Sequence, residues 1–389
     1  MKRITLVLCM LLVLACGSSA FALEGTYKIG VMVPLTGAQA EYGIGQKCAA
    51  EMAVEEINAA GGINGKELVI DVVDSGSDIE TSVELARKFV EDEEVMFILG
   101  DMYSPNCLAM APICQENGLG MLSPSASNVG VALAGDYCFM IVACQTDEQP
   151  MNAKYVLEKY LGCKNVAVLY LNNDWGTNVR DNLVGGIEDY TDMNIVMLEA
   201  VNPGEVDFSA ILSKLRMSGA DGVYLGLQIS ECAAIINQMA QSGIKDEFKI
   251  MISGGAYSNQ LLELTNGNAN GMVTSQPFFL TDTDEALMGF AAEYKERCGL
   301  DIGIMTLCAY DGMKLIADAA IRSGAATRAE LRDAVADTKG FIGLGGEITF
   351  DQYGANHRKY QIIGIENNQF VLLENADYMA DFIPPDIGK

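Results

Sequence analysis

The stretch VPLTGAQAEYGIG, residues 33–45, decides how the first part of this chain folds. It follows the apolar run YKIGVM and leads into QKCAAEMAVEEINAAGG, in which apolar residues recur at helical spacing. The pattern predicts a strand over Ile29–Pro34, a glycine-bearing loop, and a helix over Gly45–Ala60 that a Gly-Gly pair closes. A loop between a strand and a helix can hold a phosphate, a metal, a catalytic group or a small solute, and the rest of the chain has to decide which.

Strands and helices alternate along most of the chain. Apolar strands such as VMFILG (95–100), NVAVLYL (165–171) and FKIMIS (248–253) are separated by stretches with helical spacing of apolar residues. Repeated units of this length predict parallel sheets covered by helices on both faces. The pattern restarts near Glu148 and turns into helices followed by short strands after Gly271, so two α/β lobes are expected.

Composition and charge exclude several classes of protein. The chain has 389 residues, of which 50% are hydrophobic and 20% charged, which is typical of a well-cored globular protein. The formal net charge of −27 argues against nucleic acid as a partner, because binding there depends on Lys and Arg side chains that neutralise phosphates.

The first 22 residues have the pattern of a signal peptide. Lys2 and Arg3 form a basic start, Ile4–Ala15 is apolar, and Ala20-Phe21-Ala22 is a small-x-small cleavage pattern. A second interpretation is a lipoprotein signal, VLAC, in which Cys16 is lipidated and retained. Both interpretations predict export to the periplasm, and no later run is apolar for the roughly 18 residues that a membrane span needs.

Nine of the eleven cysteines follow the signal segment, so at least one has no intramolecular partner. Cys107 and Cys114 fall two turns apart on one expected helix, about 10 Å between Cα atoms, which is too far for a disulfide. The chain has no C-x-x-C motif and a single histidine, so no metal site is expected. We expect most cysteines to be small buried residues, and the sequence leaves open which of them pair.

The loops that follow the expected strands carry hydroxyls, amides and aromatic rings rather than catalytic groups. Their side chains include Tyr42, Tyr103, Ser104, Ser125, Ser127, Trp175, Gln228, Ser253 and Tyr257. In doubly wound sheets, ligands bind beyond the carboxyl ends of the strands. Hydroxyls and backbone N–H groups at helix starts can bind a carboxylate, and aromatic rings can clamp the rest of a small molecule. Each loop taken singly reads better as a helix cap or an interface, but the set predicts a binding cleft.

No motif supports an enzyme or a cofactor. The chain lacks the phosphate-binding G-x-x-x-x-G-K-[ST] loop, the dinucleotide fingerprint G-x-G-x-x-G after the first strand, and the nucleophile elbow G-x-S-x-G. The single histidine, His357, lies in the polar turn GANHRK, an unpromising place for a catalytic triad.

Several runs together resemble the leucine/isoleucine/valine-binding family of periplasmic solute-binding proteins. They include IGVMVPLTGAQAEYG, INAAGGINGKEL, LSPSASN, VAVLYLNNDWGTN, VDFSAIL and GGEITFDQYGANHRKYQI, in order along nearly the whole chain after residue 22. The resemblance implies the type I periplasmic binding protein fold, in which two doubly wound α/β lobes are joined by a three-crossover hinge and close on a ligand. It places the crossovers near residues 143–148, 275–279 and 340–346. The expected lobes are 23–145 plus 277–342 and 146–276 plus 343–389.

The resemblance also carries over a first set of site residues. Tyr42 stands where the family has an aromatic ring over the ligand side chain. Ser104 and Ser127 stand where hydroxyls hold the ligand carboxylate, and Ser125 and Ala126 stand where the backbone contributes.

In the second lobe, Trp175 stands at an aromatic wall and Gln228 at or next to a second aromatic position. One departure concerns Gly255, which stands where amino-acid-binding members have an acid against the ligand ammonium. A buried ammonium without a carboxylate partner loses about 3–5 kcal/mol of affinity. The sequence therefore favours carboxylates without an amine, or amides, over ordinary amino acids, unless Asp174 supplies the acid.

The family's disulfide in the first lobe is also missing, because its positions match Ser77 and Tyr103. The resulting prediction is an exported, monomeric solute-binding protein that delivers an amino acid, an amine-free carboxylate or an amide to a membrane ABC permease. The alternative is a sensing module of the same fold that reports its ligand to a membrane receptor.

Overall fold

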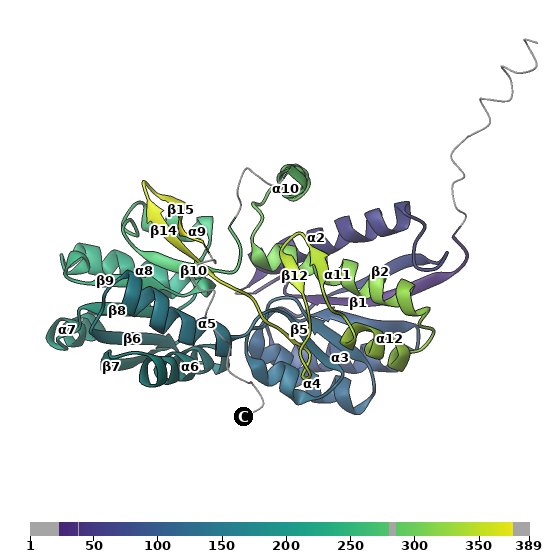
Figure 1. Ribbon diagram of the computed structural model, residues 1–389, viewed down its shortest axis with the longest axis horizontal. Helices are drawn as coiled ribbons and strands as arrows, with labels where there is room; N and C mark the ends of the chain where they lie inside the picture. The colour runs from purple at the N-terminus through teal and green to yellow at the C-terminus, as the bar shows by residue number, and fades with distance from the viewer. Residues whose placement is uncertain (1–22, 38, 280–284, 376–389) are drawn as a thin grey trace, which may run out of the picture.

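The computed structural model describes residues 23–37, 39–279 and 285–375 of the chain (Figure 1). The expected signal segment, with Cys16 and both cleavage alternatives, lies outside these residues. The described residues form two large sheets and a small two-stranded one, and the large sheets with their helices make two lobes side by side (Figure 1). This arrangement confirms the predicted α/β class.

The first sheet is entirely parallel and has the strand order β13-β5-β4-β3-β1-β2. Its strands are β1 (Thr26–Val33), β2 (Glu67–Asp74), β3 (Val95–Gly100), β4 (Gly120–Ser123), β5 (Cys138–Ala143) and β13 (Ala355–Asn356). The central strand β3 is apolar along its length because helices cover both faces of the sheet.

The second sheet has the order β15-β14-β10-β9-β8-β6-β7, parallel from β7 to β10 and antiparallel at β14 and β15. Its strands are β6 (Asn165–Leu171), β7 (Asn194–Val201), β8 (Gly222–Gly226), β9 (Lys249–Ile252), β10 (Val273–Gln276), β14 (Gln361–Glu366) and β15 (Gln369–Glu374). The chain enters this sheet after β5 and leaves it after β10.

Helices of the first lobe are α2 (Ala40–Ala59), α3 (Ile79–Glu91), α4 (Ser104–Glu116), α10 (Glu285–Cys298), α11 (Ile304–Ser323) and α12 (Arg328–Ala336). Helices of the second lobe are α5 (Gln145–Met151), which runs on into π-helical turns (Asn152–Tyr160), α6 (Asp174–Tyr190), α7 (Ser209–Met217), α8 (Ile229–Gln241) and α9 (Asn259–Thr265). Short 3₁₀ turns lie at Val129–Ala134, Lys245–Glu247 and Gly254–Ala256.

Alternation along the first strand sorts these helices onto the two faces of the first sheet. Ile29 and Val31 share a core with α2, α10, α11 and α12, whereas Met32 points to the other face and packs with α3 and α4. This is the doubly wound arrangement, and it leaves the carboxyl ends of the strands free to meet the second lobe.

The first helix begins earlier than the sequence predicts. Helix α2 starts at Ala40, so Tyr42 lies in its first turn and not in a loop. The glycines of the quoted stretch permit close packing: a Cβ atom on Gly43 would lie 1.9 Å from the carbonyl oxygen of Pro34, and one on Gly45 would lie 2.6 Å from the hydroxyl of Tyr294. The expected start at Gly45 was wrong because these glycines were taken as loop residues.

The third passage between the lobes also differs from the expectation. Strand β13 pairs with β5 of the first sheet, and Ile348 and Phe350 pack in the core of the first lobe. The short hairpin of β11 (Phe341–Gly343) and β12 (Gly346–Ile348) is held there as well. Residues 343–356 therefore stay with the first lobe, and the crossing lies beyond Asn356 instead of near 340–346.

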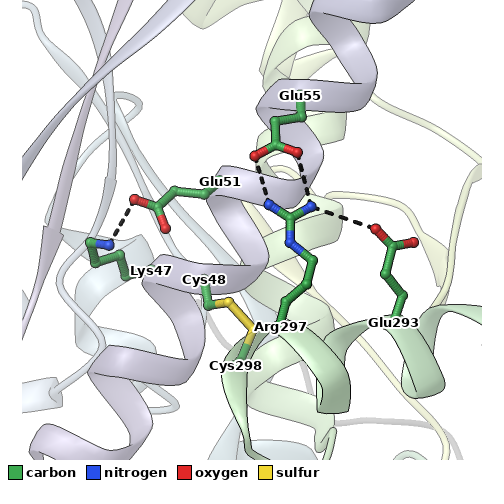
Figure 2. Close-up of a disulfide and its surroundings, with 7 residues drawn as sticks. All are labelled: Lys47, Cys48, Glu51, Glu55, Glu293, Arg297 and Cys298. Atoms are coloured by element: carbon green, nitrogen blue, oxygen red, sulfur yellow. Dashed lines mark hydrogen bonds and ion pairs between the residues drawn. A yellow bond between two sulfur atoms is a disulfide. The ribbon is translucent and has the colours of Figure 1, made fainter.

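A disulfide joins Cys48 of α2 to Cys298 at the end of α10 (Figure 2). Beside it, the guanidinium of Arg297 donates to both carboxylate oxygens of Glu55, at 2.6 and 2.9 Å. The bridge spans 250 residues of sequence, and closing so long a loop stabilises the folded state by about 5 kcal/mol in the chain-entropy model. The other seven cysteines among the described residues are buried and unpaired, as expected for most of them.

Candidate functional site

A cavity of about 80 Å³ lies between the lobes, where strands of both sheets end. A space of this volume holds roughly six water-sized groups, so it can take a small solute. The residues that line it include Gln39, Tyr42, Tyr103, Ser104, Ser125, Ser127, Gln145, Glu148, Trp175, Gln228, Gly255, Ser275 and Gln276.

The serine-rich loop after β4 supplies the first polar wall. Its backbone is folded inward because the hydroxyl of Ser123 accepts a hydrogen bond from the Ala126 N–H at 3.0 Å. Gln46 of α2 donates to the Ser125 hydroxyl at 2.6 Å, and Gln145 donates to the Ser127 hydroxyl at 2.8 Å. Both serines are buried, and their hydroxyl oxygens are held by amide groups, which leaves each hydroxyl proton available to a ligand.

The start of α4 supplies the second polar wall. Ser104 is the first residue of this helix and is buried beside the serine loop, where the Asn128 N–H donates to its hydroxyl at 3.4 Å. The first N–H groups of a helix and its dipole favour an anion at this end. A ligand carboxylate therefore has donors from two neighbouring segments of the first lobe.

The second lobe contributes an aromatic wall. The side chain of Asn173 caps α6 by accepting from the Gly176 N–H at 2.8 Å, and this cap holds Trp175 at the start of the helix with its ring in the cleft. A Cβ atom on Gly255 would lie 2.9 Å from two ring carbons of Trp175. The missing acid at position 255 thus has a steric cause, because the indole occupies the space that a side chain there would need.

Hydrogen bonds across the cleft hold the two lobes in a closed arrangement. Gln39 of the first lobe donates to the side-chain oxygen of Gln228, and Asn173 of the second lobe donates to the hydroxyl of Tyr103 at 2.9 Å. Two residues that the sequence singled out as site residues, Tyr103 and Gln228, therefore take part in contacts between the lobes.

The cleft also contains an acid that was not among the predicted site residues. Glu148 lies in the first turn of α5, directly after the chain leaves the first sheet, and its side chain is buried in the cavity wall. Burial raises the pKa of this carboxyl to about 7, against hydrogen bonds from Gln145, Asn152 and the Gly254 N–H that lower it. The sequence contains a signal for this site residue, because Glu148 in ACQTDEQP closely follows a buried strand at the expected first crossover.

Two further polar side chains at this end of the cleft have no hydrogen-bond partner among the described residues. They are the hydroxyl of Ser275 and the amide nitrogen of Gln276, which are the last two residues of strand β10 and are both buried. A buried polar group without a partner costs about 1–3 kcal/mol, and Ser275 and Gln276 both line the cavity.

Eight of the nine predicted site residues line the cavity, and the remaining one, Ala126, does not. Its N–H is already used by Ser123, so the loop presents Ser125 and Ser127 while Ala126 faces the protein interior. Among the described residues, no cluster of three or more potential metal-ligating side chains occurs, and none of their helices combines the length and apolarity of a membrane span.

Comparisons with known proteins agree with this architecture. Residues 26–369 match the family described as periplasmic binding protein. The Leu/Ile/Val-binding protein homolog 1 of Brucella abortus is 30% identical over 346 residues, covering 88% of this chain and 90% of that protein. A leucine-, isoleucine-, valine-, threonine- and alanine-binding protein of Pseudomonas aeruginosa is 29% identical, with 85% of this chain and 87% of that protein covered.

A solved structure shows the same likeness in three dimensions. The branched-chain amino acid transporter substrate binding protein LivJ from Streptococcus pneumoniae, in complex with isoleucine, superposes with a TM-score of 0.81 at 25% identity, covering 90% of this chain and all of that one. These proteins are non-enzymatic components of transport systems that act outside the cytoplasm. The match over most of the chain, together with the two-lobed fold and its interlobe cavity, establishes that this chain belongs to the periplasmic binding protein family.

Proposed function

We propose that this protein is the extracytoplasmic substrate-binding protein of a branched-chain-amino-acid-type ABC importer. It captures a small carboxylate-bearing solute between its lobes as a monomer and presents the closed complex to a membrane permease. The first lobe comprises the described residues of 23–145 and 277–356, and the second lobe those of 146–276 and 357–375.

The observation that carries this proposal is the pairing of unlike walls in one cavity. Ser104 and Ser127 place hydroxyls and a helix start on one side, and Trp175 and Tyr42 place aromatic rings around the remaining space. A carboxylate with a short apolar or aromatic body has complementary groups in each direction. Residues of both lobes line the cavity, so ligand binding and lobe closure are coupled.

The test is direct because Trp175 is the only tryptophan of the chain and lines the cavity. Purified protein that begins at Leu23 is titrated with aliphatic amino acids, aromatic carboxylates, short dicarboxylates and amides while intrinsic fluorescence and melting temperature are recorded. A ligand at 100 times its dissociation constant adds about 2.7 kcal/mol to the unfolding free energy. A fluorescence change that saturates together with a rise in melting temperature supports the proposal, and no response to any of these compounds contradicts it.

A further inference from the structure

We propose that Glu148 binds a cationic amine of the ligand, so that the protein selects solutes that carry an amine beside their carboxylate. This inference rests on the proposed function and deepens it by naming the residue that would set the specificity for an amine. Glu148 comes from the hinge and lies at a different place in the cleft from Gly255. At Gly255 itself, the indole of Trp175 fills the space that an acidic side chain would need.

The hydrogen bonds of Glu148 locate it next to the expected carboxylate site. One amide nitrogen, Nε2 of Gln145, donates both to the Ser127 hydroxyl at 2.8 Å and to Oε2 of Glu148 at 2.9 Å. The hydroxyl that holds a ligand carboxylate and the carboxylate of Glu148 are therefore neighbours. A solute in which one or two carbon atoms separate the amine from the carboxylate can reach both.

The other oxygen of Glu148 faces the turn that follows β9. A Cβ atom on Gly254 would lie 3.3 Å from Oε1 of Glu148 and 3.1 Å from Nε2 of Gln276, so these groups converge at one point of the cleft. Ser275 also lines this cavity, and a hydroxyl can accept a hydrogen bond from an ammonium group. An ammonium has three donors, and this corner offers acceptors for more than one of them.

The charges of the residues that line the cavity also favour a ligand with an amine. Among the lining residues that the structure describes, Glu148 is the only carboxylate, and no Lys, Arg or His lines the cavity. An amine-free carboxylate would bring a second anion into a cavity without a cation, whereas a zwitterion brings its own positive charge to Glu148. Gln145 donates to Oε2 of Glu148 at 2.9 Å, and this bond together with the groups of Asn152 and Gly254 lowers the pKa of Glu148 and so favours its ionised form, against the effect of burial.

The experiment uses matched pairs of probes that differ in the amine alone. Isothermal titration compares L-leucine with 4-methylpentanoate, L-valine with 3-methylbutanoate, and L-phenylalanine with 3-phenylpropanoate. We expect the amine-bearing member of the pair that binds to be at least about thirtyfold tighter than its amine-free partner. Glu148→Gln should remove most of this preference and leave the amine-free member unweakened, while the control Glu188→Gln on an exposed face of α6 changes neither.

The pH dependence of binding to the unmutated protein tests the same idea without a variant that could misfold. The titratable groups coupled to Glu148 are Tyr224 of β8 and Tyr360 beyond the third crossing, and both phenols stay neutral because burial raises their pKa values well above the ordinary value. The carboxyl has a pKa of about 7, so affinity for an amine-bearing probe should rise between about pH 5.5 and 8. Affinity for an amine-free carboxylate should fall over the same range.

The outcomes separate this inference from the proposed function. Binding of the amine-free series alone, or an unchanged preference in Glu148→Gln, overturns the role of Glu148 and leaves the proposed solute-binding function standing. Absence of binding by every probe in both series contradicts the proposed function and the amine assignment with it. Tighter binding of an amine-bearing probe that is lost in Glu148→Gln supports both.

Discussion

The Nδ1 atom of His357 lies 2.7 Å from Oδ2 of Asp147, and this contact ties the third passage between the lobes to the first. The Nε2 atom of the same ring lies 3.2 Å from Oδ2 of Asp351 in the first lobe. Hydrogen bonds to Asp147 and then Asp351 raise the pKa of His357 to about 10, so the ring is a cation at neutral pH. His357, in the stretch GANHRK that includes β13, therefore forms ion pairs with Asp147 and Asp351 at the hinge.

The first prediction concerns the ion pairs of His357. His357→Ala leaves the Asp147 carboxylate, whose side chain is 1% exposed, without its cation. We expect the unfolding free energy to fall by about 2 kcal/mol, below the range for a fully buried pair because the imidazole is partly exposed. Chemical denaturation near pH 6 measures the loss, with Lys359→Ala at the same crossing as the exposed control.

The pH dependence of this loss follows from the direction of the shift. The pKa of His357 is raised from 6.5 to about 10 on folding, so its stabilising contribution is fully present below pH 6.5 and is lost as the pH rises through 10. The difference between the two proteins should therefore shrink between about pH 6 and pH 10. An equal difference at both values would show that the ring acts through packing and not through its charge.

The second prediction concerns Gly255. Gly255→Ala places a methyl group 2.9 Å from the Trp175 ring, so the indole must move. We expect a loss of about 1–3 kcal/mol in ligand affinity because the aromatic wall is displaced. The control is Gly185→Ala on α6, where a Cβ atom meets nothing within 4 Å, and it should leave affinity unchanged. Wild-type affinity in Gly255→Ala would mean that the Trp175 ring can shift without weakening ligand binding. The contact with Trp175 would then not explain why residue 255 is a glycine.

The third prediction concerns the disulfide between α2 and α10. The double variant Cys48→Ser/Cys298→Ser should lose about 4–5 kcal/mol of unfolding free energy, because its unfolded chain is no longer closed into a long loop. Reductant should lower the melting temperature of the unmutated protein and leave that of the double variant unchanged. Both proteins retain the same buried thiols, so equal sensitivity to reductant would show that the change in melting temperature does not come from this disulfide.

The fourth prediction concerns the carboxylate site. Ser127→Ala removes a hydroxyl that can donate to a charged ligand group, and we expect a loss of about 1–3 kcal/mol in affinity. Ser213→Ala, at an exposed position of α7, is the matched control. Titration of whichever compound binds measures both, and an unchanged dissociation constant in Ser127→Ala would remove this residue from the site.

Local patterns in the sequence were sufficient for the alternation of strands and helices and for most of the cleft. The Ser-Pro start of α4 and the Asn cap before Trp175 are short-range features, because a helix start is decided by its own first turn. Polar residues that follow buried strands lie at the carboxyl edge of a parallel sheet whatever the rest of the chain does. For this reason Ser104, Ser127 and Trp175 could be placed in one cleft without coordinates.

Contacts between distant segments were decided only by the tertiary structure. The pairing of Cys48 with Cys298 depends on helices 250 residues apart, and the place of the third crossing depends on the pairing of β13 with β5. The environment of Glu148 is of the same kind, since its oxygens meet Gln145 of α5 on one side and Gly254, more than 100 residues along the chain, on the other. The sequence alone determined which groups lie at the strand ends, and the packing of the two lobes decided which acid is desolvated there, because burial and charge depend on every segment that closes around it.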